Sequence, residues 1–301
     1  MLYVFGHKSP DSDSICAAVT ATYWLNQRNR PAKAFRLGEP NRETRFIFEQ
    51  AGVELPPLLT EPVKDKDVFV VDFPEMEQGP DDLNQANIVG LIDHHRLGSL
   101  TSKAPLEAWM MPIGSSSSVL FQLFGFFNIT ITQPYARLIL GALLSDTVGL
   151  KSPTTTDTDR QIVDNLLPVA GIQLDGYISG LLKAKTDLSG LSIEELLDKD
   201  SKKFELGGKT LTVGQLELAD IAQVKALIPA LQKTMEQRVI TENRDIAALM
   251  LTNIRSEQTQ LLIAGPKSHL LAETKEGELV FEHCLSRKKQ ILPWLTEVLT
   301  K

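Results

Sequence analysis

Short apolar runs alternate with longer segments of helical periodicity through the N-terminal part of this chain. Runs of β-branched and apolar residues bounded by polar ones predict buried strands, and apolar residues spaced three and four apart predict amphipathic helices. This alternation is typical of βαβ units and a parallel sheet. The pattern predicts strands at about 2–6, 33–37, 67–72, 88–93 and 107–111, and helices at about 12–29, 41–52, 134–148, 156–170 and 174–184.

The apolar periodicity lapses at 187–190, and a different pattern follows. Gly207-Gly208 lies between two strand-like runs and predicts the turn of a hairpin. We therefore expect an α/β protein with a doubly wound parallel sheet in an N-terminal domain (1–186), a linker (187–192) and a smaller α+β domain with a mixed sheet (193–301). The later elements are a long helix at about 221–240, strands near 246–252, 259–264 and 279–282, and a final helix from about 290.

Three predicted strands and one predicted helix end in acids or imidazoles. After the first strand, Pro10 stiffens the loop, and Asp11 and Asp13, two residues apart in an extended stretch, point the same way. Carboxylates this close repel each other unless a cation lies between them. A single Asp in such a place usually caps a helix. The carboxyl ends of parallel strands, however, share one edge of a sheet, so the four segments can converge there on a metal. The candidates are His7, Asp11, Asp13, Asp72, His94, His95 and Asp146.

The residues around the two adjacent histidines leave alternatives open. Neighbouring residues at a strand end project in opposite directions, so His94 and His95 should not bind the same metal. Asp93 either orients His94 through its second ring nitrogen or caps the turn. The run of serines at 115–118 is interpreted as the capped start of a helix.

Motifs spread along the whole chain resemble the family II inorganic pyrophosphatases, the manganese- or cobalt-dependent branch of the DHH phosphoesterase superfamily. Asp-His-His alone indicates only the superfamily, whereas the sequence Ser-Arg-Lys-Lys-Gln near the end is specific to the pyrophosphatase branch. The chain departs from the family at Phe73-Pro74, where members commonly carry His-Asn, and the loss of such a polar partner bears on metal affinity. The motifs are Gly6-His7, Pro10-Asp11-Ser12-Asp13, Asp72, Asp93-His94-His95, Ser145-Asp146, Lys151-Ser152-Pro153-Thr154 and Ser286-Arg287-Lys288-Lys289-Gln290.

The resemblance implies a soluble homodimeric enzyme that hydrolyses pyrophosphate to two phosphates in a two-metal site at the domain interface. It implies two Mn²⁺ or Co²⁺ ions per subunit, with further Mg²⁺ or Mn²⁺ brought by the substrate. Oxygen ligands with a minority of imidazole suit such ions. By resemblance, His7 and Asp11 bind one metal, Asp13, His94 and Asp146 bind the other, and Asp72 bridges them. His95 is then the general acid, with a structural hydrogen bond as the alternative role, and Lys202, Arg287 and Lys288 bind phosphate, although Lys203 leaves the register of Lys202 open.

Composition narrows the alternatives. The net charge of −7 argues against a nucleic-acid partner, and the chain has no apolar run long enough to span a bilayer. Cys16 and Cys284 form no ligand pattern and suggest reduced residues of a cytoplasmic protein. Two other readings remain: a DHH phosphodiesterase acting on oligonucleotides or cyclic dinucleotides, whose Gly-Gly-Gly-His element is absent here, and a catalytically silent phosphate-binding regulator, whose inserted module does not fit between Asp72 and Asp93.

Overall fold

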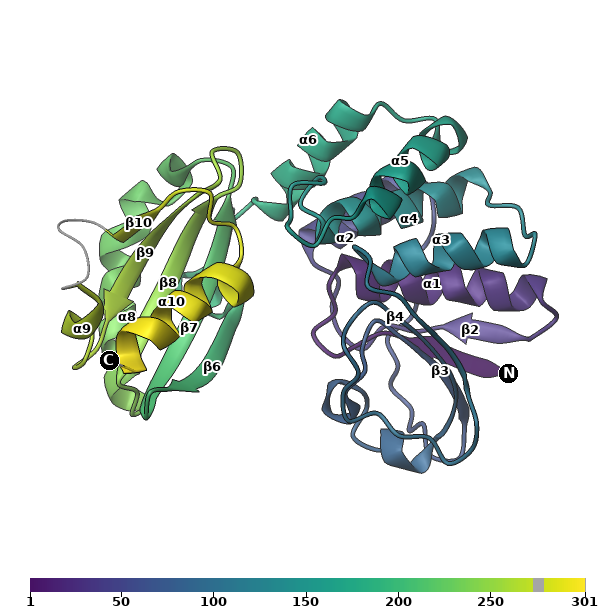
Figure 1. Cartoon of the computed structure of the whole chain (residues 1–301), viewed down its shortest axis with the longest axis horizontal. Helices are drawn as coiled ribbons and strands as arrows, with labels where there is room; N and C mark the ends of the chain where they lie inside the picture. The colour runs from purple at the N-terminus through teal and green to yellow at the C-terminus, as the bar shows by residue number, and fades with distance from the viewer. Residues whose placement is uncertain (273–278, 301) are drawn as a thin grey trace. The chain divides into compact units, whose positions relative to one another are not determined.

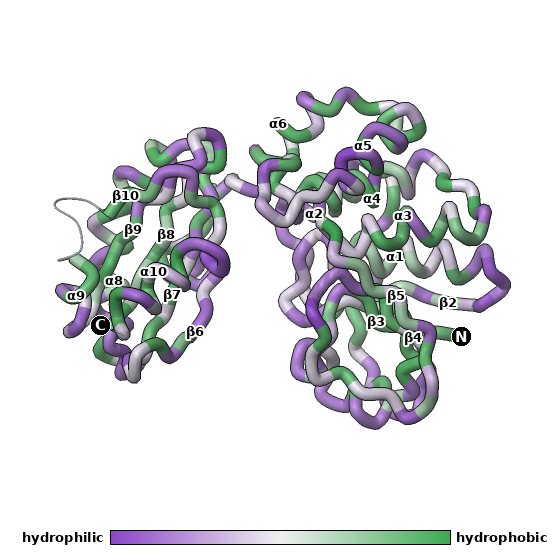
Figure 2. Tube along the Cα trace, viewed as in Figure 1, coloured by the Kyte–Doolittle hydropathy of each residue, from purple (hydrophilic) through white to green (hydrophobic). Residues whose placement is uncertain are grey.

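The computed structural model describes residues 1–272 and 279–300, which form two compact units, Met1–Lys185 and Thr186–Lys301. Figure 1 shows each unit as a sheet flanked by helices. Apolar residues run along the strands of both units, and hydrophilic residues gather in the loops (Figure 2). Among the described residues, no helix combines the length and the apolar character needed to cross a membrane.

The first unit contains a five-stranded sheet in the order β2-β1-β3-β4-β5, and all its strands are parallel. The predicted parallel α/β fold is confirmed. In this order β2 and β3 lie on opposite sides of β1. The connections that follow β1 and β3 therefore lead in opposite directions, and the carboxyl ends of these two strands form a topological switch point. Open α/β sheets bind ligands at such a point. The strands are β1 (Leu2–Phe5), β2 (Ala32–Ala34), β3 (Asp67–Val71), β4 (Asn87–Asp93) and β5 (Glu107–Met110).

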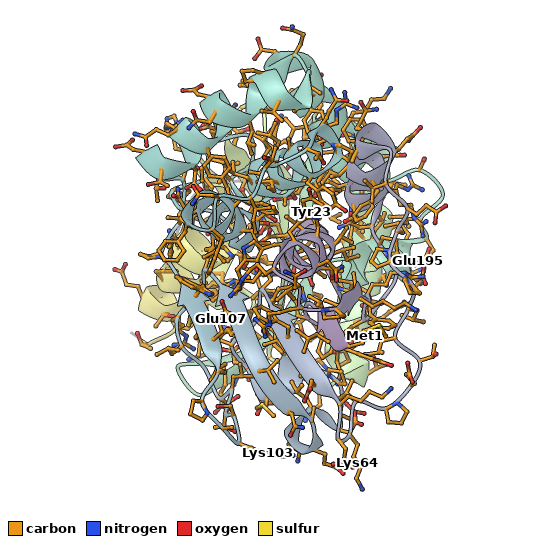
Figure 3. All side chains as sticks on the ribbon, turned by 90° about the vertical axis from the view of Figure 1, so that its right-hand side faces the viewer. Met1, Tyr23, Lys64, Lys103, Glu107 and Glu195 are labelled. Carbon is orange, nitrogen blue, oxygen red and sulfur yellow. The ribbon has the colours of Figure 1, made fainter. Side chains whose placement is uncertain are left out.

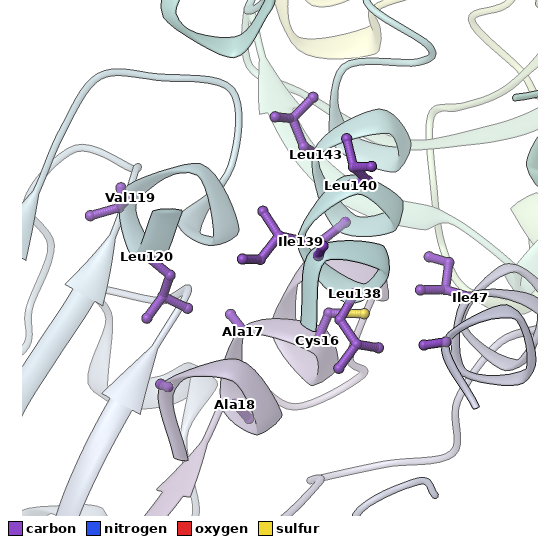
Figure 4. Close-up of a cluster of buried hydrophobic side chains, with 14 of the residues drawn as sticks. Cys16, Ala17, Ala18, Ile47, Val119, Leu120, Leu138, Ile139, Leu140 and Leu143 are labelled. Atoms are coloured by element: carbon purple, nitrogen blue, oxygen red, sulfur yellow. The ribbon is translucent and has the colours of Figure 1, made fainter. Parts of the chain in front are cut away.

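Six α-helices cover one face of this sheet. The helices α1 and α3 pack on the strands, and α4 packs on both of them. Side chains from α1 to α4 meet in one apolar cluster, where Ala17 and Ala18 let the helices approach closely (Figure 4). Each fully buried Leu or Ile in such a core contributes about 1.5–3 kcal/mol. The helices are α1 (Ser12–Gln27), α2 (Arg42–Ala51), α3 (Ser116–Phe126), α4 (Gln133–Asp146), α5 (Asp157–Ala170) and α6 (Leu174–Lys185).

The opposite face is covered by loops and two short 3₁₀ helices, Met76–Gln78 and Leu83–Gln85. A second apolar cluster forms beneath them, and its buried members include Phe5 and Phe73. In Figure 3, which looks along α1, Tyr23 lies on the helix-covered side, and Lys64 and Lys103 lie among the loops of the other side. The switch-point edge of the sheet is thus supported by two packed layers.

The second unit contains a mixed sheet in the order β10-β9-β8-β7-β6, in which only β7 and β8 are parallel neighbours. The predicted hairpin is confirmed, with Gly207 and Gly208 at φ 56° and 68° in its turn. One apolar cluster joins α7 and α8 to one face, and another joins α10 to the other. The elements are α7 (Ile193–Asp198), β6 (Ser201–Leu206), β7 (Lys209–Leu218), α8 (Ile228–Thr241), β8 (Ile246–Asn253), β9 (Gln258–Ala264), α9 (His269–Ala272), β10 (Leu279–Phe281) and α10 (Leu292–Thr300).

The long helix predicted at 221–240 is shorter than expected. Two 3₁₀ turns, Ile221–Gln223 and Lys225–Leu227, precede α8, and Pro229 lies in the first turn of α8. Proline favours that position because it has no N–H group to pair with a preceding turn. The final helix likewise begins late, after a π-helical turn over Arg287–Ile291.

Candidate metal centre

The loop after β1 presents His7 and Asp11 at the switch-point edge of the sheet. Gly6 permits this geometry, because a Cβ atom there would lie 2.0 Å from the Ser14 Oγ and 2.7 Å from the Ser14 carbonyl oxygen. The Asp11 carboxylate caps α1 by accepting a hydrogen bond of 3.0 Å from the Ser14 N–H. Its other oxygen lies 3.6 Å from the Nε2 atom of His7. Asp11 therefore caps a helix and also faces an imidazole.

Asp72 lies directly after β3 and is almost fully buried. Its φ of 66° places a non-glycine residue in the left-handed region, a strain that tends to occur at functional sites. This backbone turns the carboxylate between two imidazoles, with one oxygen 3.5 Å from the His7 Nε2 and the other 3.5 Å from the His94 Nε2. Asp72 thus lies where one carboxylate could serve two ions.

The rings of His7 and His94 are both oriented through Nδ1. This atom lies 2.8 Å from the Lys8 carbonyl oxygen in His7 and 3.0 Å from the Ile113 carbonyl oxygen in His94. Because a carbonyl can only accept, Nδ1 is the donor in both rings, and Nε2 is the atom that faces the carboxylates. Metal-binding histidines are typically held this way.

The predicted metal ligands all come together at this edge. Asp72 is common to a group with His7 and Asp11 and a group with His94 and His95, and the ligand atoms within each group lie within 4.8 Å of one another. A third group of the same size joins Asp13, His94 and Asp146. The six predicted ligands therefore form one continuous cluster of oxygen and nitrogen donors.

The electrostatics of the cluster favour the binding of protons or cations. Burial, together with the charges of Asp13 and Asp11, raises the pKa of Asp72 and of Asp146 well above the usual range. Burial opposes protonation of His7, but its hydrogen bonds and charge interactions with Asp11 and Asp72 raise its pKa to about 11. Carboxylates this crowded take up protons or cations. Hard oxygen donors with two imidazoles suit divalent ions such as Mn²⁺, so the residues fit the implied metals.

The serine run at the start of α3 supports this cluster. Ser115 caps α3 by accepting from the Ser118 N–H, as predicted. The next two residues have a further role that sequence reasoning missed: the N–H groups of Ser116 and Ser117 donate to the two oxygens of buried Asp13, at 2.6 and 3.0 Å. The hydroxyl of Ser116 also donates to Asp72 at 2.9 Å. The positive N-terminus of α3 therefore positions two of the carboxylates.

Asp159 is another residue whose role sequence reasoning missed. Its buried carboxylate accepts hydrogen bonds from the Gly114 N–H at 3.0 Å and the Ser118 hydroxyl at 2.8 Å. It also accepts from the N–H and hydroxyl of Thr156, which completes a capping box at α5. Asp159 thereby ties the start of α3 to the start of α5 behind the metal cluster.

The expectation that His94 and His95 project in opposite directions is wrong. Their ring centroids lie 4.2 Å apart, and both rings face Asp72. The strand ends at Asp93, whose carboxylate accepts from the backbone N–H groups of both histidines at 2.7 and 3.0 Å, so the chain turns and the two-residue alternation of a strand stops. Of the two roles left open for Asp93, capping the turn is observed.

Asp93 also holds the ring of His95, with 2.8 Å between its Oδ1 and the Nδ1 of His95. This hydrogen bond raises the pKa of His95, although burial opposes the shift. The His95 side chain is 46% exposed, whereas His94 is 14% exposed. His95 is therefore an oriented imidazole with an accessible edge. Phe73, in contrast, is fully buried and stacks on Phe5 at 6.5 Å, so it adds packing below the loop and no polar partner.

The basic residues predicted to bind phosphate lie in the second unit. Lys202 and Lys288 are exposed, and Arg287 is mostly buried. The Arg287 guanidinium pairs with the Asp200 carboxylate at 2.7 Å and donates to the carbonyl of Val213 at 3.2 Å. Val213 is also the residue opposite Lys202 in the sheet, so Arg287 and Lys202 lie on the same part of the second unit.

Two known protein families match successive parts of the chain. Residues 1–144 match the N-terminal domain of the DHH family, and residues 179–298 match the DHHA2 domain. Full-length relatives follow the same pattern. A Methanocaldococcus jannaschii protein named manganese-dependent inorganic pyrophosphatase is 36% identical, with 97% of each chain covered. An Enterococcus faecalis protein named "Probable manganese-dependent inorganic pyrophosphatase" is 35% identical over 99% of this chain and 98% of its own.

A solved structure extends the likeness to the fold. The crystal structure of a protein described as "Methanococcus jannaschii putative family II inorganic pyrophosphatase" superposes with a TM-score of 0.81. The two chains are 34% identical, and each is covered completely. The sequence and the fold therefore point to the same family.

Proposed function

The chain belongs to the manganese-dependent family II inorganic pyrophosphatases, and on this premise we propose that it hydrolyses pyrophosphate to two phosphates at the cluster around Asp72. The observation that carries this proposal is the position of the Asp72 carboxylate, 3.5 Å from the Nε2 atoms of both His7 and His94. A phosphodiesterase or a silent regulator has no observation in its favour, whereas the full-length relatives carry the pyrophosphatase name.

We propose that His7 and Asp11 hold one Mn²⁺ ion, that Asp13, His94 and Asp146 hold a second, and that Asp72 contacts both. Co²⁺ would suit the same donors, and a further Mg²⁺ or Mn²⁺ would arrive with pyrophosphate. When bound, such a pair of ions neutralises phosphate charge and lowers the pKa of a water to make it nucleophilic. The chain's own part is to hold its ligands rigid, through the Nδ1 hydrogen bonds of His7 and His94 and the support of α3.

We propose that His95 donates the proton that the departing phosphate needs. Its Nδ1 is held by Asp93 at 2.8 Å, so the accessible Nε2 is the atom that would face a substrate oxygen. An oriented imidazole of this kind is the commonest general acid. The buried Asp93 carboxylate would then stabilise the ring while it is protonated.

The remaining charge on pyrophosphate requires basic residues, and we propose Lys202, Arg287 and Lys288 for that role. An arginine fork grips phosphate oxygens in pairs, and lysine adds a compact charge. The pairing of Arg287 with Asp200 would fix the orientation of the fork before substrate arrives. In this proposal the chain consists of a metal-binding domain (1–186), a linker (187–192) and a substrate-binding domain (193–301). Catalysis would require the two domains to close on the substrate.

Three further expectations belong to this proposal: the location, the assembly and the effect of the Phe73-Pro74 segment. The location that we propose is the cytoplasm, where buried thiols such as those of Cys16 and Cys284 stay reduced. A homodimer is the expected assembly. The packed Phe73-Pro74 segment should alter the affinity for the metals and leave their positions unchanged, because it replaces a polar partner beside Asp72 and no ligand.

Removing the metals tests the proposed function directly. Full-length protein treated with a chelator should lose the release of phosphate from pyrophosphate, and Mn²⁺ or Co²⁺ should restore it better than Mg²⁺. A linear dinucleotide assayed in parallel with each metal should yield little product. Equal restoration by Mg²⁺ without a tightly bound transition metal would contradict the proposed site, and faster cleavage of the dinucleotide would favour the phosphodiesterase.

A further inference from the structure

The second unit contains a cavity that the proposed reaction does not use. Its volume is about 240 Å³, and it lies between α7, α8 and the face of the sheet that these helices cover. Lys203 lines it, whereas the neighbouring Lys202 belongs to the proposed phosphate site. Because successive side chains of β6 point to opposite faces, the cavity and the phosphate site lie on opposite sides of the sheet.

Two residues that line the cavity each carry a buried polar atom without a hydrogen-bond partner in the described part of the chain. The Oγ1 of Thr212 and the Nε of Arg244 are both buried, and neither makes a hydrogen bond within the described part of the chain. The guanidinium of Arg244 also has no acidic partner there. A buried donor left unsatisfied destabilises the fold. Two such donors beside one cavity indicate a ligand that accepts hydrogen bonds.

The other charges around the cavity compensate one another. Arg238 forms a two-pronged pair with Asp198, with 2.9 Å between Nη2 and Oδ2. Lys203 lies 3.9 Å from the carboxylate of Glu242. Among these four groups and Arg244, only the Arg244 guanidinium lacks a counter-charge within the described part of the chain. The cavity therefore favours a ligand with one negative charge over a multiply charged phosphate compound.

The rest of the lining is apolar. Met235 and Val239 of α8 line the cavity together with Ala247 and Leu249 of β8, and all four belong to the core cluster of this face. An apolar cavity of about 150 Å³ can hold benzene. The space here is large enough for a small apolar body.

From these features we propose that the cavity is a binding site for a small organic monocarboxylate. Its carboxylate accepts hydrogen bonds from Arg244 and Thr212, and its apolar body packs against Met235 and Val239. The turn that ends α8 directs Arg244 inward, because Asn243 adopts a left-handed conformation with φ of 50° and the chain reverses there. Such a ligand would stabilise the second unit by binding only its folded state.

Calorimetric titration of the full-length, manganese-loaded protein tests this site, with benzoate and 3-methylbutanoate as probes. We expect one equivalent of carboxylate to bind the unchanged protein, and neutral benzamide not to bind. Arg244→Gln should weaken carboxylate binding at least about tenfold, since hydrogen bonds to charged groups contribute about 1.5–3 kcal/mol. Thr212→Val, which keeps the shape of the side chain, should weaken it less. The matched control is Arg255→Gln, a change at an exposed arginine of the same unit that does not line the cavity.

Two further readouts separate this site from the metal centre. Pyrophosphate hydrolysis by the Arg244→Gln variant should match that of the unchanged protein, and benzoate should raise the melting temperature of the Arg255→Gln control but not that of Arg244→Gln. Equal carboxylate binding by the Arg244→Gln variant and the control would place the carboxylate elsewhere and overturn the proposal. Absence of saturable binding by both carboxylates, or Arg244-dependent binding of inorganic phosphate alone, would overturn it as well.

Discussion

Changing Asp72 to asparagine should lower the turnover of pyrophosphate by about 10³-fold or more. A lost outer partner of a metal site typically costs about 10–100-fold, and Asp72 is proposed to contact both ions. Its carboxylate also accepts a hydrogen bond of 2.9 Å from Ser116, so the variant disturbs the N-terminus of α3 too. Elemental analysis of the purified Asp72→Asn variant should show fewer than two Mn²⁺ ions per chain.

The matched control for this change lies on the same strand. Asp67 begins β3, is exposed and accepts a hydrogen bond of 3.2 Å from Asn87. Asp67→Asn therefore alters one carboxylate at the other end of β3 and should leave turnover and metal content unchanged. If Asp72→Asn kept two ions and near-normal turnover, Asp72 could not be the shared ligand.

Removing the proposed phosphate-binding residues should spare the metals and slow the reaction. Arg287→Ala, Lys288→Ala and Lys202→Ala should each lower turnover by about 10²–10³-fold, or about 3–4 kcal/mol, because each removes a preorganised charge from the transition state. The Michaelis constant should rise as well, since pyrophosphate must approach a protein with a net charge of −7. Steady-state kinetics and metal analysis of each variant measure both effects.

Arg287 needs a second variant, because its guanidinium also bonds to Asp200 and Val213 within the fold. Arg287→Lys keeps the charge and should restore only part of the activity, since an ammonium cannot make the two-pronged contact. Lys203→Ala is the control for Lys202→Ala, because the two side chains lie on opposite faces of β6, and it should leave turnover unchanged. If an Arg287 variant folded stably, bound both ions and turned over pyrophosphate at the normal rate, Arg287 would not be a substrate-binding residue.

The parallel sheet and the cluster at its edge could be predicted because both follow from local patterns. Each strand is a short apolar run, and an acid or imidazole follows directly where the run ends, as at Asp72 after β3. Parallel strands must bring such ends to one edge. The position of His7 and Asp72 at the switch point between β1 and β3 follows from the strand order, which the sequence pattern alone does not specify.

The supporting residues could not be predicted, because their partners are distant in sequence. Ser116 and Ser117 bond to Asp13 across about 100 positions, and Asp159 reaches Gly114 across 45. A serine run before an apolar segment is typical of any helix start, so the pattern carries no sign of the carboxylates. The short helix α7 was not predicted, although the capping box between Ser192 and Glu195 marks its start in the sequence.

The most direct test of the metal centre is anomalous diffraction at the manganese edge from crystals of the manganese-loaded protein. Two peaks should appear at the edge of the first sheet, one contacted by His7 and Asp11 and the other by Asp13, His94 and Asp146. The carboxylate of Asp72 should contact both. A single peak, or manganese bound away from Asp72, would contradict the two-metal site on which the proposed reaction depends.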